Sequence, residues 1–354
     1  MVARDVEIPD TSRIPKPDIQ NLKFLPGIVN GTEVEKMLGT ITGEGDDNIT
    51  TVNTCEEEDD KSNISSDFVG SIQRESNIEV TQIKSFQLSQ KDEIRYMFSP
   101  EPDVCLLKCT DRNSVKHSNG TGQIKHSINL GTKTDGFTVT TDNRLLFCCT
   151  HQECIKEMEL PSGEIIEKID TSPLIPNCIC TGPSGDIYVT LYDEDGCDVT
   201  EDSTRVLDRY NRWGRKKKRC KNDRCGRNIF VLPDEICVNN TGTRVAVINK
   251  INERRSELIL LDKGLRPVLI YRGPSVITGN VMGGFELTGV IFDSRDNILT
   301  TEVFSNTVQL LSPSCEPLKT LMIMDTIPCC MTIHGNEVWV GDNYGNVVTF
   351  RYSY

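Results

Sequence analysis

An internal repeat constrains the fold of this 354-residue chain more than any other feature. Residues 287–321 contain three short apolar runs separated by turns rich in Asp, Asn, Ser and Pro, which is typical of short β-strands. A tight turn followed by an apolar strand recurs along the chain, about every 39 to 57 residues. The turns are Pro102-Asp103, Asp142-Asn143, Gly185-Asp186, Gly242-Thr243, Asp296-Asn297 and Gly335-Asn336.

This spacing fits the four-stranded blade of a β-propeller, because a single blade cannot bury both of its faces alone. Six turns predict an all-β fold with six blades over residues 81–354. The last turn is followed by one further strand, 347–352, so the sixth blade lacks a strand. We expect residues 81–88 to supply it by pairing with the C-terminal strand, which removes the open edges. An open β-sandwich or two small β domains is the alternative.

Residues 1–80 differ in composition from the repeats. They hold 7 Lys and Arg against 17 Asp and Glu, a net charge of 7 − 17 = −10, and include the acidic run 56–60. Such a composition favours a mostly disordered acidic linker. Thr32, Glu35 and Gly39 form a capping-box signature, which predicts a short helix at 32–38.

Cysteine usage and the N-terminus bear on the compartment. Many of the 15 cysteines lie within apolar strands, as expected of free thiols in a reducing cytoplasm. The N-terminus has no apolar signal region and no segment is long enough to span a bilayer, so we expect a cytoplasmic protein without a membrane partner. Cys220 and Cys225 have a gap wide for zinc and are interpreted as independent cysteines, so neither metal nor cofactor is expected.

The segment 205–227 is strongly basic within a chain of net charge −13. It holds 11 Lys and Arg against 2 Asp and Glu, a local charge of 11 − 2 = +9, interleaved with two aromatic residues. Three interpretations stay open: protection of an edge strand against aggregation, docking of an acidic protein partner, and RNA binding by phosphate contacts and stacking. The candidate residues are Arg205, Arg209, Tyr210, Arg212, Trp213, Arg215, Lys216, Lys217, Lys218, Arg219, Lys221, Arg224 and Arg227.

Residues 287–321 resemble an NHL repeat, and the phrases at 175–196 and 205–216 resemble the C-terminal propeller of tripartite-motif proteins of molluscan type. The stretch 24–43 resembles the connector that precedes that propeller. In this family a RING finger, B-box zinc fingers and a coiled coil come first, and their Cys/His spacing and heptads are absent here. The resemblance therefore implies a non-catalytic recognition module for protein partners, related to ubiquitin ligases but not itself an enzyme.

Two alternatives to this function follow from other features. RNA binding would use a basic face that includes 205–227, whereas DNA is not expected as a partner. A metal-dependent lactonase-like enzyme would need carboxylates around a central channel, for which Asp142, Asp186 and Asp293 are candidates, although acidic residues in turns usually cap the turn itself. Without a coiled coil we expect a monomer.

Overall fold

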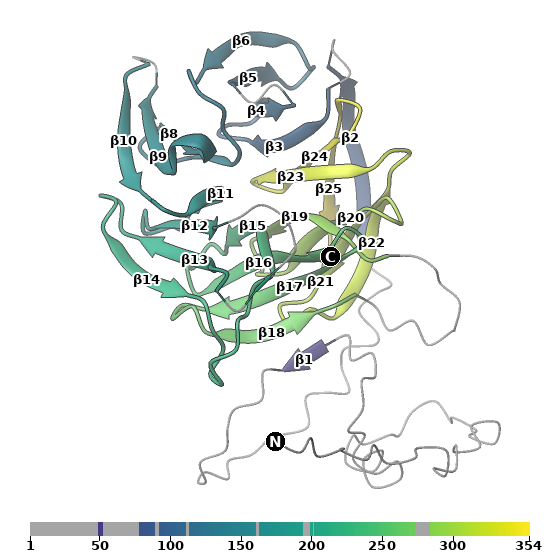
Figure 1. Cartoon of the computed structure of the whole chain (residues 1–354). Coiled ribbons are helices and arrows are strands. Elements are labelled where there is room, and N and C mark those ends of the chain that lie inside the picture. Colours follow the sequence, from purple (N-terminus) through teal and green to yellow (C-terminus); the bar gives the residue numbers. More distant parts are fainter. Residues whose placement is uncertain are drawn as a thin grey trace, which may run out of the picture. The chain divides into compact units, whose positions relative to one another are not determined.

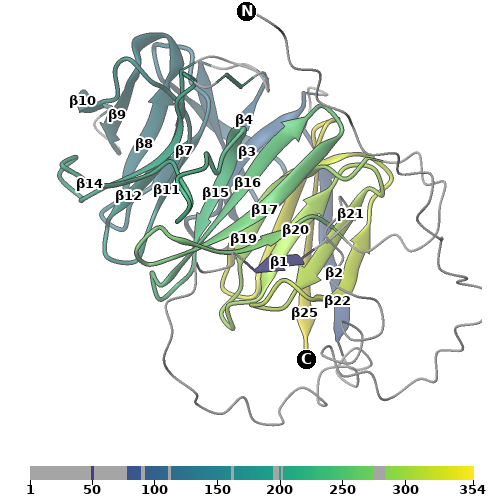
Figure 2. The same cartoon turned by 60° about the horizontal axis from the view of Figure 1, so that its bottom comes forward.

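The computed structural model describes residues 49–51 (backbone only), 78–88, 92–110, 113–160, 163–193, 199–200, 202–273 and 284–354. These residues fold into six antiparallel β-sheets, which are the six predicted blades (Figures 1 and 2). The linker and short helix predicted within 1–80 lie outside the described residues, apart from β1 (Ile49–Thr51) and the first residues of β2. β1 pairs with the outer strand β18 of blade 4.

Each blade starts with an inner strand and continues outward through consecutive antiparallel strands. Blade 1 comprises β3 (Ile94–Phe98), β4 (Val104–Cys109), β5 (Ser114–Asn119) and β6 (Ile124–Asn129). Blade 2 comprises β7 (Phe137–Val139), β8 (Arg144–Cys149), the 3-10 turn η5 (Thr150–Gln152), β9 (Cys154–Glu159) and β10 (Ile165–Asp170). Blade 3 comprises β11 (Ile175–Thr181), β12 (Ile187–Tyr192), β13 (Arg205–Tyr210) and β14 (Lys216–Cys220).

Blades 4 to 6 repeat this order, and the last blade is completed from the N-terminal side. Blade 4 comprises β15 (Leu232–Val238), β16 (Arg244–Asn252), β17 (Arg255–Asp262) and β18 (Pro267–Tyr271). Blade 5 comprises β19 (Leu287–Phe292), β20 (Ile298–Glu302), β21 (Thr307–Leu311) and β22 (Pro317–Ile323). Blade 6 comprises β23 (Pro328–His334), β24 (Glu337–Asp342), β25 (Asn346–Ser353) and β2 (Glu79–Gln87).

The strand at the N-terminal side of the propeller joins the two ends of the described fold. β2 contains all but the last residue of the expected segment 81–88 and pairs antiparallel with β25 from Glu79–Ser353 to Gln87–Asn346. Lys319 of blade 5 also donates a hydrogen bond to the carbonyl oxygen of Ile78, just before β2. Because β2 fills the outer position of blade 6, no blade is left with three strands among the described residues.

The six repeated turns share an unusual backbone conformation. One residue in each turn between an inner strand and the second strand has a positive φ, between 58° and 76°. This left-handed conformation is open to Gly and tolerated by Asp and Asn, and it is costly for other side chains. The six positions are Asp103, Asn143, Gly185, Gly242, Asp296 and Gly335. The turn residues that revealed the repeat are therefore selected by backbone geometry.

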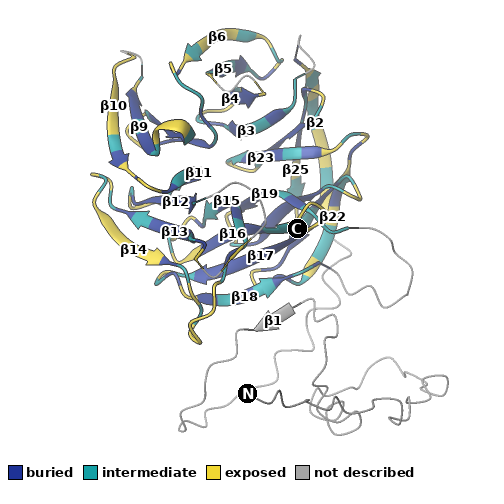
Figure 3. Ribbon diagram, viewed as in Figure 1, coloured by how far each residue is buried: buried dark blue, intermediate teal, exposed yellow. Residues whose placement is uncertain are grey.

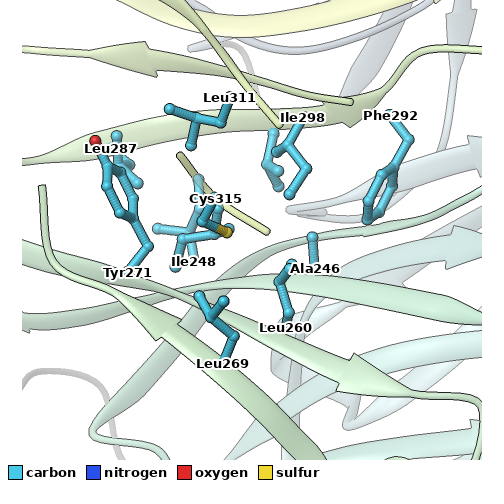
Figure 4. Close-up of a cluster of buried hydrophobic side chains, with 12 residues drawn as sticks. Ala246, Ile248, Leu260, Leu269, Tyr271, Leu287, Phe292, Ile298, Leu311 and Cys315 are labelled. Carbon is cyan, nitrogen blue, oxygen red and sulfur yellow. The ribbon is translucent and has the colours of Figure 1, made fainter. Parts of the chain in front are cut away.

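The core is divided into six clusters, one between each pair of adjacent blades, including blades 6 and 1. The second strand β16 shows how the sequence builds them. Val245 and Val247 face blade 3, whereas Ala246 and Ile248 face blade 5, and all four are fully buried. Since side chains alternate between the faces of a strand, a continuous apolar run serves two cores at once. Figure 4 shows the cluster between blades 4 and 5.

Candidate functional site

The inner strands of the blades surround a central channel. A cavity of about 210 Å³ lies in it, lined by β3, β7, β11, β15, β19 and β23. Most of the lining is apolar, with Met97, Phe137, Ile236, Ile291 and Met331 among the contributors. At about 210 Å³ the cavity is smaller than the roughly 300 Å³ and above of most ligand sites, so it suits only a small ligand.

Glu235 on β15 is the carboxylate in this lining. Its side chain is half-buried because it faces the cavity while protein encloses its other sides. The thiol of Cys178 on β11 donates a hydrogen bond to Glu235 Oε2, with an Sγ–Oε2 distance of 3.3 Å. Burial, followed by the nearby charge of Asp234, raises the pKa of Glu235 to about 8. A raised pKa keeps the acid form of this carboxyl group populated near neutral pH, so the group can donate a proton.

Tyr96 on β3 reaches the same part of the channel from blade 1. Burial, and then the negative charge of Glu235, raise the pKa of the Tyr96 phenol well above its ordinary value. The charges of Cys178 and Asp234 act in the same direction. The phenol thus remains a neutral hydrogen-bond donor. A protonated carboxyl group and a phenol that face one apolar cavity can polarise a carbonyl oxygen.

Asp234 precedes Glu235 and is held in an ion pair. Lys250 Nζ lies 2.8 Å from Asp234 Oδ2, and Asn177 Nδ2 donates to Oδ1 at 3.0 Å. Asp234 raises the pKa of Lys250, so this amine keeps its charge. Both carboxylate oxygens of Asp234 are therefore engaged, and its charge acts on Glu235 at a distance.

We expect the substitution Asp234→Asn to lower the pKa of Glu235 toward its ordinary value. It removes a negative charge that raises this pKa and leaves the positive charge of Lys250, which lowers it. Carbon-13 NMR titration of the glutamate carboxyl groups measures the shift. Glu253→Gln, at an exposed turn, is the matched control and should not move the titration of Glu235. An unchanged pKa in Asp234→Asn would contradict this electrostatic assignment.

The basic segment covers β13, the outer strand β14 of blade 3 and the residues that follow, and β14 is mostly exposed (Figure 3). Several of its cations form ion pairs. Asp208, fully buried, binds Lys216 and Arg219, and its second oxygen accepts from buried Tyr210. Asp186 likewise forms ion pairs with Arg209 and Lys217. Two separate ion pairs join Arg205 to Asp193 and Arg227 to Asp223.

The remaining candidates are distributed over the rim. The others are Arg212, Arg215, Lys218, Lys221 and Arg224, of which Lys221 is half-buried and the rest are exposed. Trp213 is 75% exposed. The structure therefore brings part of the predicted set together through two buried aspartates. Whether this surface binds an acidic protein or RNA stays a prediction.

The sequence did not single out Glu235, Tyr96 or Cys178. The signal that was available is the adjacent pair Asp234-Glu235 on the strand that precedes the fourth repeated turn. The carboxylates considered from the sequence lie elsewhere. Asp293 accepts hydrogen bonds from the backbone N–H groups of Arg295 and Asn297 and so caps its turn, as expected of acidic turn residues.

The donor set of the channel does not fit a calcium ion, which takes about six to eight oxygen ligands. Asp234 is occupied by Lys250 and Asn177, which leaves Glu235 as the carboxylate in the described lining of the cavity. In the part of the chain that the structure describes, no group of three or more His, Cys, Asp or Glu side chains could hold a metal ion. A search of the same residues finds no helix with the length and apolarity to cross a membrane.

Comparisons with known proteins support the fold. A gluconolactonase from Xanthomonas campestris superimposes with a TM-score of 0.57 at 11% identity, covering 86% of this chain and 100% of that chain. A streptogramin B lyase has a TM-score of 0.52 at 14% identity, covering 79% and 100%. The calcium-binding protein regucalcin from Agrobacterium tumefaciens has a TM-score of 0.52 at 13% identity, covering 74% and 92%. No family model and no curated protein matches the sequence.

These findings contradict two expectations from the sequence: that the chain is a non-catalytic recognition module of the tripartite-motif kind, and that it is not an enzyme. The gluconolactonase and the lyase are enzymes of this fold, and nothing in the comparisons supports a tripartite-motif scaffold. The resemblance misled because it relied on turn and strand patterns, which any propeller of this geometry needs. The chain is a six-bladed β-propeller similar in fold to gluconolactonase and streptogramin lyase.

Proposed function

We propose that this protein is an enzyme that opens a small lactone or related ester in its central channel. The observation that carries the proposal is the Glu235 carboxyl group, which has a pKa raised to about 8 and faces an apolar cavity of about 210 Å³. A pKa near the working pH is what general acid–base catalysis requires. The gluconolactonase similar in fold supports the choice of a lactone as the substrate class.

The reaction can be written with this chain's own residues. Tyr96 donates a hydrogen bond to the carbonyl oxygen, where negative charge develops when water attacks the carbonyl carbon. Glu235 gives its proton to the ring oxygen as the bond between the carbonyl carbon and that oxygen breaks. The proton released by the attacking water returns to the Glu235 carboxylate, so the product is the open-chain hydroxy acid. Cys178 holds Glu235 through its thiol.

The experiment is a screen of small five- and six-membered lactones, with acid release followed by a pH indicator. We expect hydrolysis at pH 7 well above the spontaneous rate, and a loss of about 10-fold or more in kcat for Tyr96→Phe, which removes one donor. Tyr344→Phe, at an exposed tyrosine, is the control. Failure of every lactone to react faster than in buffer would overturn the proposal.

Treatment with a chelator gives a separate prediction. Because the channel offers no calcium ligand set among its described residues, we expect the activity to survive dialysis against EDTA within about 2-fold, since catalysis by a bound metal would supply several kcal/mol. Rates before dialysis, after dialysis and after calcium is restored measure the effect. A loss that calcium reverses would show that a metal takes part.

We also propose that the resemblance of residues 287–321 to an NHL repeat reflects common descent. Blade 5, β19 to β22, carries this resemblance. It adds nothing to the assignment of function, because Tyr96, Cys178 and Glu235 come from blades 1, 3 and 4.

A further inference from the structure

A second cavity lies between blades 2 and 3, away from the channel, and has about 290 Å³. We call it the Trp213 pocket. Its lining comes from the turns that start β8 and β12, from β9 and β10, and from the tip of the β13–β14 hairpin. The residues that matter to its chemistry are Asp142, Arg144, Glu157, Lys168, Arg212 and Trp213.

Hydrogen bonds hold the backbone at the tip of the hairpin, while the Trp213 side chain is 75% exposed. Asn211 Oδ1 accepts hydrogen bonds from the backbone N–H groups of Trp213 and Arg215, at 3.1 and 2.9 Å. Gly214 has a φ of +84°, and a Cβ at this position would lie 2.5 Å from the carbonyl oxygen of Lys168 in blade 2. The hairpin tip is therefore seated on the next blade. A large aromatic ring held on a fixed backbone beside a cavity is a platform for stacking.

The pocket is lined by three cations, of which two are held in ion pairs. Glu157, 4% exposed, is bound by Arg144 Nη1 and Lys168 Nζ, each at 2.8 Å. The Arg212 guanidinium lies over the Trp213 ring, 5.8 Å from its centroid, and its charge contributes to lowering the pKa of Asp142 after the larger effect of the Thr140 hydrogen bond. Arg144 also lies 3.4 Å from Asp142 and 3.8 Å from Glu159, so it is shared by three carboxylates. Arg212 is then the lining cation that an anionic ligand can pair with, in a chain of net charge −13.

We propose that the Trp213 pocket binds a nucleoside monophosphate. The base stacks on the Trp213 indole, and the phosphate pairs with Arg212 at the mouth. The volume, at the lower end of the range of about 300 Å³ and above for ligand sites, suits one nucleotide. This site is independent of the channel, because no residue lines both cavities except Thr181.

The chain's two tryptophans make the test direct, since Trp339 is buried and Trp213 is exposed. Titration with AMP, GMP, CMP and UMP should quench the exposed indole saturably, and calorimetry should give the same Kd. We expect Trp213→Ala to weaken binding at least about 10-fold by calorimetry, as loss of one stacked base does. Adenosine, which lacks the phosphate, should bind at least about 10-fold more weakly than AMP.

The matched control is Ile323→Ala, at an apolar side chain that is also 75% exposed but lies on blade 5. It should bind AMP like the parent protein. No saturation by any nucleotide up to about 10 mM, or equal affinity in Trp213→Ala, would overturn the proposal. So would equal affinity for adenosine and AMP. Tight, salt-dependent binding of a single-stranded RNA without binding of mononucleotides would overturn it in favour of an RNA surface on the rim.

Discussion

Replacement of Glu235 by glutamine is expected to lower kcat for lactone hydrolysis by about 100-fold or more, the usual contribution of a general acid. The amide keeps the size and the hydrogen-bonding shape of the neutral carboxyl group, but it cannot give a proton to the ring oxygen. The channel and its cavity of about 210 Å³ should therefore be retained, and KM should change little. Steady-state kinetics at pH 7 with the best lactone measures the effect.

The pH dependence gives a second readout of the same residue. Because the pKa of Glu235 is about 8, its acid form is lost as pH rises through 8, and kcat should fall over this range. Stability should respond as well. Between the ordinary pKa of 4.5 and a pH of about 8, the folded state keeps a proton that the unfolded state releases. The free energy of unfolding therefore falls as pH rises through this window, and this dependence should be weaker in Glu235→Gln.

The control for both measurements is Glu253→Gln, at an exposed turn between β16 and β17. It makes the same chemical change without touching the channel, so kinetics and stability should match the parent protein. A kcat for Glu235→Gln within about 3-fold of the parent would contradict the role of Glu235, since general acid catalysis is worth far more. An unaltered pH dependence of stability would contradict its raised pKa.

Substitution of Trp339 by alanine should destabilise the propeller by about 3 to 5 kcal/mol, the usual cost of emptying a buried tryptophan site. Trp339 on β24 is 1% exposed and lies in the cluster between blades 6 and 1. Its ring meets Phe86 of β2 edge to face, with centroids 6.3 Å apart. The substitution thus weakens the contact that holds the closing strand β2 on the last blade. Urea unfolding followed by far-UV circular dichroism measures the free energy.

Trp213→Ala is the matched control, because it removes the same side chain from an exposed position. Its stability should stay within about 0.5 kcal/mol of the parent protein. If both variants lose the same stability, the loss belongs to tryptophan removal in general and not to closure of the ring. If Trp339→Ala unfolds like the parent protein, the packing of blade 6 against blade 1 does not stabilise the fold.

The repeated turns could be predicted from sequence because their chemistry is local. A residue such as Asn143 or Asp296 with a positive φ must be chosen from very few amino acids, and the apolar run that follows must face two cores. Period and composition therefore indicated six blades. The function could not be predicted in this way, because turn and strand patterns are shared by propellers with unrelated activities.

The candidate site depends on contacts between distant parts of the chain. Tyr96, Cys178 and Glu235 come from blades 1, 3 and 4, and each looks like an ordinary strand residue in its local sequence. The basic segment shows the opposite case. Its +9 charge is plain in the sequence, but buried Asp186 and Asp208 pair with four of its cations, and this pairing depends on strand register.

The amino-acid sequence by itself determined the class of fold, the number of blades and the position of the repeated turns, because these follow from backbone conformation and side-chain alternation over a few residues. Only the tertiary structure decided which side chains meet in the channel, which cations form ion pairs and which residues line the pocket beside Trp213. The physical reason is that the pKa of Glu235 and the charge of each cavity depend on burial and on neighbours from other blades.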